Sequence, residues 1–398
     1  MKLCASYQVL WWQTRLHFVA DGQAVLSFEI ANFLQLQTVI VNAKKTDEQN
    51  MTEKHKILQQ VLDNAIDNKK IFGTSFCVKY KDEIWCGASG NLNTESQYFI
   101  ASTTKLFVTA IILNFKSKGL LDLDDKISKY LDKETLNGLH ILNGQDFSNE
   151  ITIKNLLAHT SGIPDYFQQK DKEGKSMESI LTKGNDQLWT FEKTIEYSKS
   201  LKPLFIPNAK GKAHYSDTNF QLLGRIIEKI TSKSISDNYK ELIFEPIGLD
   251  KTYLYTDITD TKPKTFYYKD KELLIPKAMA SFGPDGGIVS TSSEMMTFIE
   301  AFFSGIFFPK SYIDTLKVWN RIFFPMQSGI GIHRFKLLWI FNPFGTIPEL
   351  IGHSGLSGAL AYHSPDKELY ITGTVNQVAY PDTSFRLAIK LIQKTLTK

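Results

Sequence analysis

Strand-like segments lie towards both ends of this chain, and a helix-rich stretch separates them. One pair of apolar runs, 76–80 and 84–86, flanks a short polar turn, and so does a second pair, 362–365 and 370–374. Such pairs are typical of hairpins, whose strands run antiparallel. Helices inserted between two strand-bearing ends predict an α+β fold. We therefore expect an antiparallel sheet flanked by helices, with an inserted all-helical domain.

The change of texture along the 398 residues sets the expected domain boundaries. Residues 1–49 form an uncharacterised N-terminal extension, residues 50–121 plus 275–398 form the α/β domain, and residues 122–274 form the helical domain. The polar stretch 168–185 is interpreted as a surface loop. Apolar residues at helical spacing predict helices at 50–70, 102–118, 153–157, 191–201, 220–231, 235–244 and 385–396. A cleft between two such lobes is the usual place for a site.

The charge pattern and the first residues bear on the possible partners. The 46 basic and 42 acidic side chains are mixed along the chain, with a net charge of +4 and no dense basic block. Nothing in this pattern points to nucleic acid or to an anionic membrane surface as the partner. Within 1–49, polar residues interrupt every apolar stretch, so no clear membrane anchor or leader peptide is visible. A divergent leader, a poorly ordered extension and translated sequence upstream of a start at Met51 stay open.

Three cysteines, Cys4, Cys77 and Cys86, are too few for a disulfide scaffold and lack the spacing of a zinc site. In the first predicted hairpin, a two- or four-residue loop places Cys77 directly opposite Cys86. Opposed residues have Cα atoms about 4.5–5.5 Å apart, which is within disulfide range. A disulfide and a pair of reduced, small apolar residues are both compatible with the sequence.

Ser102 and Lys105 lie three residues apart at the start of a predicted helix. This spacing puts both side chains on one helix face, so the amine can reach the hydroxyl. A lysine whose pKa is lowered by burial or neighbouring charge can take the proton of a serine nucleophile. The N–H groups of the helix N-terminus favour an oxyanion at the same place. Taken alone, however, the pair is better explained as a helix cap followed by a solvated lysine.

Further blocks follow the Ser-Lys pair in order, and together they carry the assignment. They are Leu156–Tyr166, Phe205–Pro207 with His214–Gly224, Glu245–Leu249 with Thr252, Gly286–Thr291, and Gly352–Gly358. The set resembles the serine β-lactamase and penicillin-binding protein superfamily, in its branch of class C β-lactamases, D,D-carboxypeptidases and related esterases. The resemblance covers residues 50–398 and implies a β-lactamase/transpeptidase-like fold.

The resemblance also implies roles for the catalytic residues. Ser102 would form the acyl-enzyme, and Lys105 would accept its proton or keep the neighbouring tyrosine poised. Tyr215 holds the place of a tyrosine that shuttles protons between nucleophile, leaving group and water. A phenol can do this near neutral pH only if cations lower its pKa, and Lys105 and His353 are the candidates.

A second group of residues is expected to bind the substrate. His353-Ser354-Gly355 would lie on a strand that lines the cleft, where a glycine lets the substrate approach the backbone closely. By the same resemblance, the backbone N–H groups of Ser102 and Leu356 would form the oxyanion hole. His159 is expected to be structural and to bind backbone near the domain junction.

Two positions depart from the family pattern. Position 217 is Asp where the family most often has Asn, and an ionised Asp only accepts hydrogen bonds. Beside Lys105, an ionised Asp217 would favour the charged ammonium, which weakens lysine as a base and shifts that role towards Tyr215. In this interpretation Asp217 is a compromise. Alternatively, Asp217 is protonated or turned away from the site. His353 replaces the lysine usual in β-lactamases of this class, and a mostly neutral histidine anchors a substrate carboxylate less strongly. This favours a peptidase or esterase over an efficient β-lactamase.

We therefore expect a serine hydrolase that forms a Ser102 acyl-enzyme with a D-amino-acid peptide, a β-lactam or an ester. The alternative is a catalytically impaired relative that serves as a peptidoglycan- or ligand-binding module. The expected partner is a small-molecule or peptide substrate. No cofactor and no metal are expected, because the eight histidines show no paired metal-ligand spacing. Analogy with the family places the protein outside the cytoplasm, in the periplasm or secreted.

Overall fold

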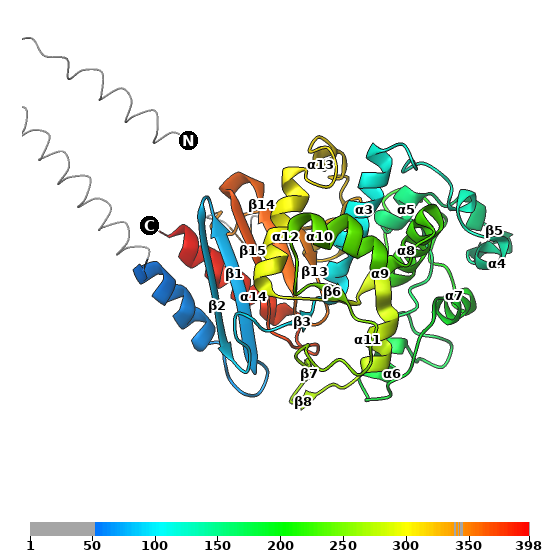
Figure 1. Cartoon of the computed structure of the whole chain (residues 1–398). Helices are drawn as coiled ribbons and strands as arrows, with labels where there is room; N and C mark the ends of the chain where they lie inside the picture. The colour runs from blue at the N-terminus through cyan, green and yellow to red at the C-terminus, as the bar shows by residue number, and fades with distance from the viewer. Residues whose placement is uncertain (1–51, 338–339, 341, 343–344, 398) are drawn as a thin grey trace, which may run out of the picture. The chain divides into compact units, whose positions relative to one another are not determined.

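The computed structural model describes residues 52–337, 340, 342 and 345–397. Its main sheet joins strands from near the start and from near the end of this described part of the chain (Figure 1). Within these residues, eight antiparallel strands follow one another in the order β10-β11-β12-β13-β14-β15-β1-β2. Their bounds are β1 Gly73–Tyr80, β2 Glu83–Gly90, β10 Asn320–Phe323, β11 Met326–Ser328, β12 His333–Phe335, β13 Leu350–Ser354, β14 Leu360–Ser364 and β15 Leu369–Thr374. Because β1 pairs with β15, the two predicted hairpins form the sheet together, and the predicted α+β fold is confirmed.

The predicted extension at 1–49 lies outside the described residues. Ile57–Lys398 form one compact unit. The boundaries predicted at 121/122 and 274/275 remain predictions.

The first hairpin has the predicted register. Cys77 lies directly opposite Cys86 in the β1–β2 ladder, with Cα atoms 4.1 Å apart, and the two form a disulfide. Of the two alternatives left open by the sequence, the structure therefore contains the bonded one. Phe76 and Val78, on either side of Cys77, point to the opposite face of the sheet, as the two-residue period of a strand requires.

Helices cover both faces of the sheet. On one face, a helix over residues 52–63 and α14 (Asp382–Leu396) bury apolar side chains such as Leu62 and Leu391 against β1 and β15. On the other face, α12 (Ser292–Ser304) and α3 (Lys105–Ser117) share a core that includes Phe107 stacked on Phe298, 3.6 Å between ring centroids. The apolar run after Ser102 is thus the predicted buried helix, and all of its apolar side chains are buried.

The middle of the chain is mainly helical. Its helices are α4 Lys133–Leu136, α5 Ile153–Leu157, α6 Met177–Leu181, α7 Phe191–Ser200, α8 Asp217–Thr231, α9 Ile235–Tyr239 and α10 Glu245–Ile247. Later in the chain, α11 spans Pro276–Phe282 and α13 spans Tyr312–Thr315. Helix α6 corrects the prediction of a loop at 168–185. Its Ser176 and Ser179 form a capping box, and its Met177 and Leu181 are buried, which stabilises a helix too short to show helical periodicity.

Short strands interrupt this helical region, which was expected to be all-helical. They pair as β4 (Ile141–Leu142) with β5 (Gln145–Asp146), and as β7 (Tyr267–Tyr268) with β8 (Lys271–Glu272). A further small sheet has the order β3-β9-β6, with β3 Tyr98–Phe99, β6 Tyr253–Leu254 and β9 Ile288–Ser290. Strands of two residues are too short to show a two-residue alternation, so the sequence pattern could not reveal them.

Candidate active site

Ser102 sits on a tight turn between strand β3 and helix α3. A 3-10 turn, Ala101–Thr104, precedes α3, and Ala101 has φ of +46°, which is unusual for a residue with a side chain. The Ser102 hydroxyl makes no capping bond to this helix, and the side chain is half-buried. The explanation of Ser102 as a mere helix cap is therefore wrong, and the hydroxyl stays reachable.

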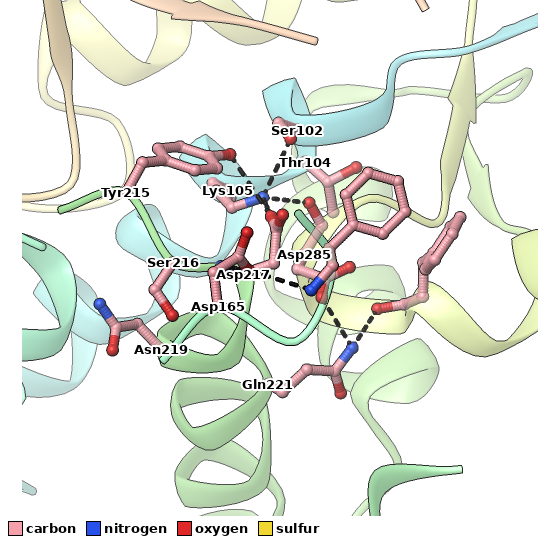
Figure 2. A network of polar contacts seen from close by, with 12 residues as sticks. Ser102, Thr104, Lys105, Asp165, Tyr215, Ser216, Asp217, Asn219, Gln221 and Asp285 are labelled. Carbon is pink, nitrogen blue, oxygen red and sulfur yellow. Dashed lines mark hydrogen bonds and ion pairs between the residues drawn. The ribbon is translucent and has the colours of Figure 1, made fainter. Parts of the chain in front are cut away.

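The Lys105 ammonium is buried and has three acceptors, one for each of its hydrogens (Figure 2). It donates to Ser102 Oγ at 3.1 Å, to the Asp285 carbonyl oxygen at 2.5 Å and to Asp217 Oδ1 at 2.5 Å. A solvated lysine was the alternative at this position, and the 0% exposure of Lys105 excludes it. The spacing of Ser102 and Lys105 places them in contact, as predicted.

Asp217 begins helix α8 and faces the pair. Its backbone N–H donates to Asp165 Oδ1 at 2.9 Å, which holds the first turn of α8 in place. The Tyr215 hydroxyl donates to Asp217 Oδ1 at 3.4 Å, the same oxygen that accepts from Lys105. Asp217 is thus turned into the site, and the alternative in which it turns away is wrong.

The charge state of Lys105 follows from these contacts. Burial is the largest single influence and by itself favours the neutral amine, but the neighbouring acidic groups, Asp217 foremost, together outweigh it and raise the pKa of Lys105 above its usual range. Lys105 is therefore an ammonium, as predicted from the presence of Asp217. In this state it donates to Ser102 and has no lone pair with which to take the serine proton.

Tyr215 lies beside the pair, packed on a histidine. Its ring stacks on His159 with centroids 4.5 Å apart, and Lys105 Nζ lies 5.3 Å from the ring centroid. Nearby cations were predicted to lower the pKa of Tyr215, and this prediction is wrong, because the pKa is raised overall. Burial and Asp217 raise this pKa above its usual value, and the opposing effect of Lys105 is smaller. Tyr215 is therefore a neutral phenol, able to donate a proton.

His159 has the structural role expected of it. Its Nδ1 accepts from the Ser216 N–H at 3.1 Å, and its carbonyl accepts from the His214 N–H at 2.9 Å. Burial lowers the pKa of His159 well below its usual value, so the ring is neutral. These contacts fix the backbone on both sides of Tyr215.

Two buried carboxyl groups near Lys105 were missed by the sequence reasoning. Asp165 accepts from the backbone N–H groups of Phe167, Gln168 and Asp217, while the Asp285 carboxyl accepts from Tyr166 and Gln221. Burial, followed by repulsion from Asp217, raises the pKa of both groups. Both residues belong to or adjoin motif blocks, so an acidic residue in an apolar block was the signal that could have found them.

Strand β13 packs its C-terminal end against the serine turn. A Cβ added to Gly355 would lie 2.4 Å from the Ile100 carbonyl oxygen and 3.2 Å from the Ser102 nitrogen. The Ser357 hydroxyl donates to the Phe99 carbonyl at 2.7 Å and ties the same two segments. Only glycine fits this approach. It brings the backbone at Gly355 close to that of Ser102, next to Leu356, whose N–H the resemblance assigns to the oxyanion hole. Ser354 ends the strand half-buried.

His353 stacks on a second histidine that the sequence did not single out. The His353 and His333 rings lie 3.9 Å apart between centroids, and His353 lies 6.3 Å from the Tyr215 ring. Burial lowers the pKa of His333 to about 3 and that of His353 well below its usual value. Both rings are therefore neutral, so His353 supplies no charge to Tyr215 or to a substrate carboxylate. No motif surrounds His333, and only the β12–β13 pairing reveals it.

A hollow opens beside the serine turn. Most of its wall is apolar, and three acidic residues complete it. It is lined by Ala101, Tyr166, Phe167, Glu178, Leu181, Thr182, Asp217, Phe266, Leu273, Ile275, Met279, Phe282, Asp285, Gly286, Leu356, Ser357 and Val378. The residues flanking Ser102 and the predicted oxyanion hole, Ala101 and Leu356, are part of this wall. The hollow therefore adjoins the serine turn.

None of the helices among the described residues is long and apolar enough to cross a bilayer. No cluster of three or more His, Cys, Asp or Glu side chains in the described part is arranged to hold a metal ion.

A family model described as beta-lactamase matches residues 58–395, which is most of the chain. This chain belongs to the beta-lactamase family. The family is one of serine hydrolases, and the predicted resemblance is confirmed.

Among curated relatives, an N-acetylmuramyl-L-alanine amidase of Bacillus subtilis (strain 168) is 31% identical over 215 residues, or 53% of this chain and 44% of that protein. A penicillin-binding protein of the same organism is 26% identical over 331 residues, or 76% of this chain and 66% of that protein. A protein of Escherichia coli (strain K12) named as a D-alanyl-D-alanine carboxypeptidase is 28% identical over 205 residues, or 51% and 44%. The chain thus spans 44% to 66% of the length of these relatives.

Solved structures of the family share the fold. A D-stereospecific amidohydrolase from a Streptomyces species has a TM-score of 0.68 at 24% identity, covering 82% of this chain and 95% of that one. A D-amino acid amidase from Ochrobactrum anthropi SV3 has a TM-score of 0.71 at 20% identity, covering 87% of this chain and 100% of that one. These similarities establish the β-lactamase/transpeptidase-like fold.

Proposed function

We propose that this member of the beta-lactamase family is an active serine acyl-hydrolase that forms an acyl-enzyme on Ser102. The observation that carries the proposal is the buried chain of contacts from Ser102 Oγ through Lys105 Nζ to Asp217 Oδ1, with distances of 3.1 and 2.5 Å. A surface lysine would not be completely buried with every hydrogen donated to an acceptor. Such an arrangement connects a hydroxyl to a carboxylate base through an ammonium relay.

Acylation begins with attack of Ser102 Oγ on the carbonyl carbon of the substrate. The serine proton moves to Lys105 Nζ as an ammonium proton of Lys105 moves to Asp217 Oδ1. Asp217 thus gains the proton that Ser102 loses, Lys105 remains an ammonium, and the negative charge appears on the substrate oxygen. The site keeps its net charge throughout this step. Asp217 is then the base, and Lys105 is the relay that the structure shows saturated with acceptors.

The oxyanion is stabilised by the backbone N–H groups of Ser102 and Leu356. Gly355 permits the close approach of the segment after β13 to the serine turn, which supports a pair of donors at this place. N–H groups fixed in advance cost no reorganisation when the charge develops.

Loss of the leaving group completes acylation and restores the site. As the carbonyl re-forms and the C–N or C–O bond breaks, the Tyr215 hydroxyl donates its proton to the departing atom. Asp217, protonated in the first step, returns a proton to Tyr215 across the 3.4 Å contact. A neutral phenol suits this role as general acid. In deacylation, water attacks the ester and loses its proton to Asp217 by way of Tyr215. Lys105 then returns a proton to Ser102 Oγ, and Asp217 replaces it on Lys105.

The proposed substrate is a D-amino-acid peptide, a β-lactam or an ester, with amides and esters favoured. The curated relatives include proteins named as a penicillin-binding protein and a D-alanyl-D-alanine carboxypeptidase, which supports a D-amino-acid compound. His353 is neutral and buried, so it offers no charge to the carboxylate that a penicillin carries.

The alternative of an impaired relative that only binds ligands rests on the same Lys105–Asp217 pair, because a charged lysine is no base by itself. Hydrolysis of p-nitrophenyl acetate, nitrocefin and a D-Ala-D-Ala peptide by the wild type and by Ser102→Ala separates the two. We expect the wild type to hydrolyse at least one of these compounds, and Ser102→Ala to lose at least about 10³-fold of that rate with an unchanged thermal unfolding midpoint. Hydrolysis retained by Ser102→Ala would refute the proposed nucleophile. A folded wild type that hydrolyses none of them would favour the binding module.

A further inference from the structure

The hollow beside Ser102 has walls suited to a bulky apolar group. Phe266, Leu273, Ile275, Met279 and Phe282 form one side, contributed by helix α11 and the segments before it. These side chains belong to one buried apolar cluster, so the wall is preformed. A group of phenyl or isobutyl size attached to the acyl carbon would bury its surface here.

Among the described residues, the hollow is lined by carboxyl groups and by no basic side chain. Glu178, Asp217 and Asp285 line it, and no Lys, Arg or His is among its described lining residues. Lys105 lies behind this wall, is completely buried, and has all three hydrogens donated to acceptors. The site therefore offers no free cation to a substrate carboxylate. It offers carboxylates to a substrate cation instead.

Resting on the proposed function, we infer that the preferred acyl donor is an apolar α-amino acid with a free ammonium group, presented as its amide or ester. The apolar side chain fills the hollow. The ammonium group is recognised by Asp217 and, from across the hollow, by Glu178.

Asp217 is in position to contact an α-ammonium group. Its carboxylate and Ser102 Oγ both bind Lys105 Nζ, at 2.5 and 3.1 Å, so they lie on two sides of one ammonium. The α-nitrogen of an acyl group is only two bonds from the carbonyl carbon that Ser102 attacks, and so it enters the same neighbourhood. Both side-chain contacts that the structure gives Asp217 fall on Oδ1. Oδ2 is therefore the oxygen assigned to the substrate N–H.

Glu178 is an acidic residue of the hollow whose carboxylate forms no ion pair among the described residues. It lies on α6 and is partly buried, and within the described residues its carboxylate accepts only a long bond of 3.4 Å from Gln168. None of the ion pairs of the described chain includes it. Burial and the charge of Asp217 both raise the pKa of Glu178, because the two carboxylates repel each other. A cation placed between them relieves this repulsion.

The proposed substrate explains why position 217 is an aspartate rather than the asparagine usual in the family. An asparagine there could donate to a substrate carbonyl, whereas Asp217 only accepts. An acceptor at this point matches a substrate that brings N–H donors of its own. An N-acylated donor loses the positive charge, and a donor with a carboxylate in the hollow meets three acidic residues.

Three anilides that differ only at the α-position test the inference. They are phenylalanine p-nitroanilide in both enantiomers, its N-acetyl derivative, and 3-phenylpropionyl p-nitroanilide, which lacks the nitrogen. We expect the wild type to hydrolyse the better enantiomer of the ammonium compound with a kcat/KM at least about tenfold above those of the other two. Glu178→Gln should narrow this ratio roughly fivefold, as expected for the loss of a partly exposed charge pair.

Glu173→Gln provides the matched control. Glu173 is exposed shortly before α6, pairs with Lys175 and does not line the hollow, so removing its charge should leave the ratio unchanged. Equal or faster hydrolysis of the N-acetyl or desamino compound by the wild type would overturn the inference, as would an unchanged ratio in Glu178→Gln.

Labelling of Ser102 by a fluorophosphonate separates this inference from the proposed function. Labelling without hydrolysis of any of the anilides would overturn the inference and leave the proposed function intact. Absence of both would overturn the two together.

Discussion

Lys105 is the residue whose surroundings decide the chemistry of the site. An ammonium group removed from water is costly unless it is paired and fully hydrogen-bonded. Asp217, Asp285 and Ser102 supply the three acceptors that offset this cost. The same contacts take away the lone pair of Lys105, so a proton can enter from Ser102 only if another leaves to Asp217. From the sequence, Asp217 was interpreted as a residue that weakens Lys105 as a base. In the proposed mechanism it is instead the group that accepts the proton lost by Ser102.

The Asp217→Asn variant tests this assignment. An amide cannot take the proton from Lys105, so we expect acylation of Ser102 at pH 7 to fall by about 10²-fold. Burial without the Asp217 charge lowers the pKa of Lys105, and the free amine can then act as the base. The acylation rate of the variant should therefore rise with pH, which stopped-flow measurement over pH 6–10 would show. Acylation at the wild-type rate with the same pH profile would mean that Asp217 is not the acceptor.

At the residue scale, the sequence revealed the residues that lie inside recognisable motifs. Ser102, Lys105 and Tyr215 were found in this way, and the structure brings them together. Glu178 and His333 were missed because nothing local marks them. Each becomes significant only through partners far away in the chain, Asp217 for one and His353 for the other.

Strand β13 and the serine turn form one unit at the element scale. Gly355 lies against the Ile100 carbonyl, and Ser357 is bonded to Phe99, so the position of the strand sets the distance between the two predicted oxyanion donors. The hydroxyl of Ser102 and the backbone of Leu356 are therefore positioned by contact between two elements.

The Gly355→Ala variant should separate these elements. A Cβ would meet the Ile100 carbonyl at 2.4 Å, so the strand or the turn must move. We expect acylation of Ser102 to slow by about 10²-fold, as for the loss of an oxyanion donor, and stability to fall by about 1–3 kcal/mol. Acylation kinetics together with urea unfolding would measure both effects. A stable variant that acylates at the wild-type rate would show that this close approach does not position the oxyanion hole.

The sequence patterns revealed the elements in which apolar residues recur regularly over many positions. The hairpin β1–β2, helix α3 and helix α8 all carry apolar periodicity over many residues. Strands β10, β11 and β12 were not predicted, because each has only three or four residues and gains its place by pairing with β13 through the sheet. Helix α6 was not predicted either, because its five residues are too few to show helical periodicity. Its capping box and its buried side chains stabilise it.

At the scale of the whole molecule, the site depends on segments from most of the chain. Lys105 comes from α3, Asp217 from α8, Asp285 from the turn before β9, and His353 from β13. The motif order along the sequence identified this fold because the family shares it. The contacts between the segments could not be read from the sequence, since they depend on how the sheet and the helices pack.

The buried histidines make the stability of the whole molecule sensitive to acid. The pKa of His333 falls from 6.5 to about 3 on burial, so its neutral form stabilises the protein above pH 6.5. This contribution is lost as the pH falls from 6.5 towards 3. Between pH 6.5 and 5 the loss amounts to about 2 kcal/mol. Denaturant unfolding of the wild type and of His333→Phe at both pH values measures it. We expect the free energy of unfolding to decrease between these pH values by about 2 kcal/mol less in His333→Phe than in the wild type. Equal decreases in the two proteins would contradict the lowered pKa of His333.

We propose that Ser102 is a nucleophile activated through Lys105. The most direct measurement is reaction with a fluorophosphonate, followed by mass spectrometry of the labelled peptides, for the wild type and for Lys105→Met. We expect a single modification on Ser102 in the wild type and a labelling rate at least about 10²-fold lower in the folded variant. A folded wild type with no label on Ser102, or a Lys105→Met variant labelled there at the wild-type rate, would contradict it.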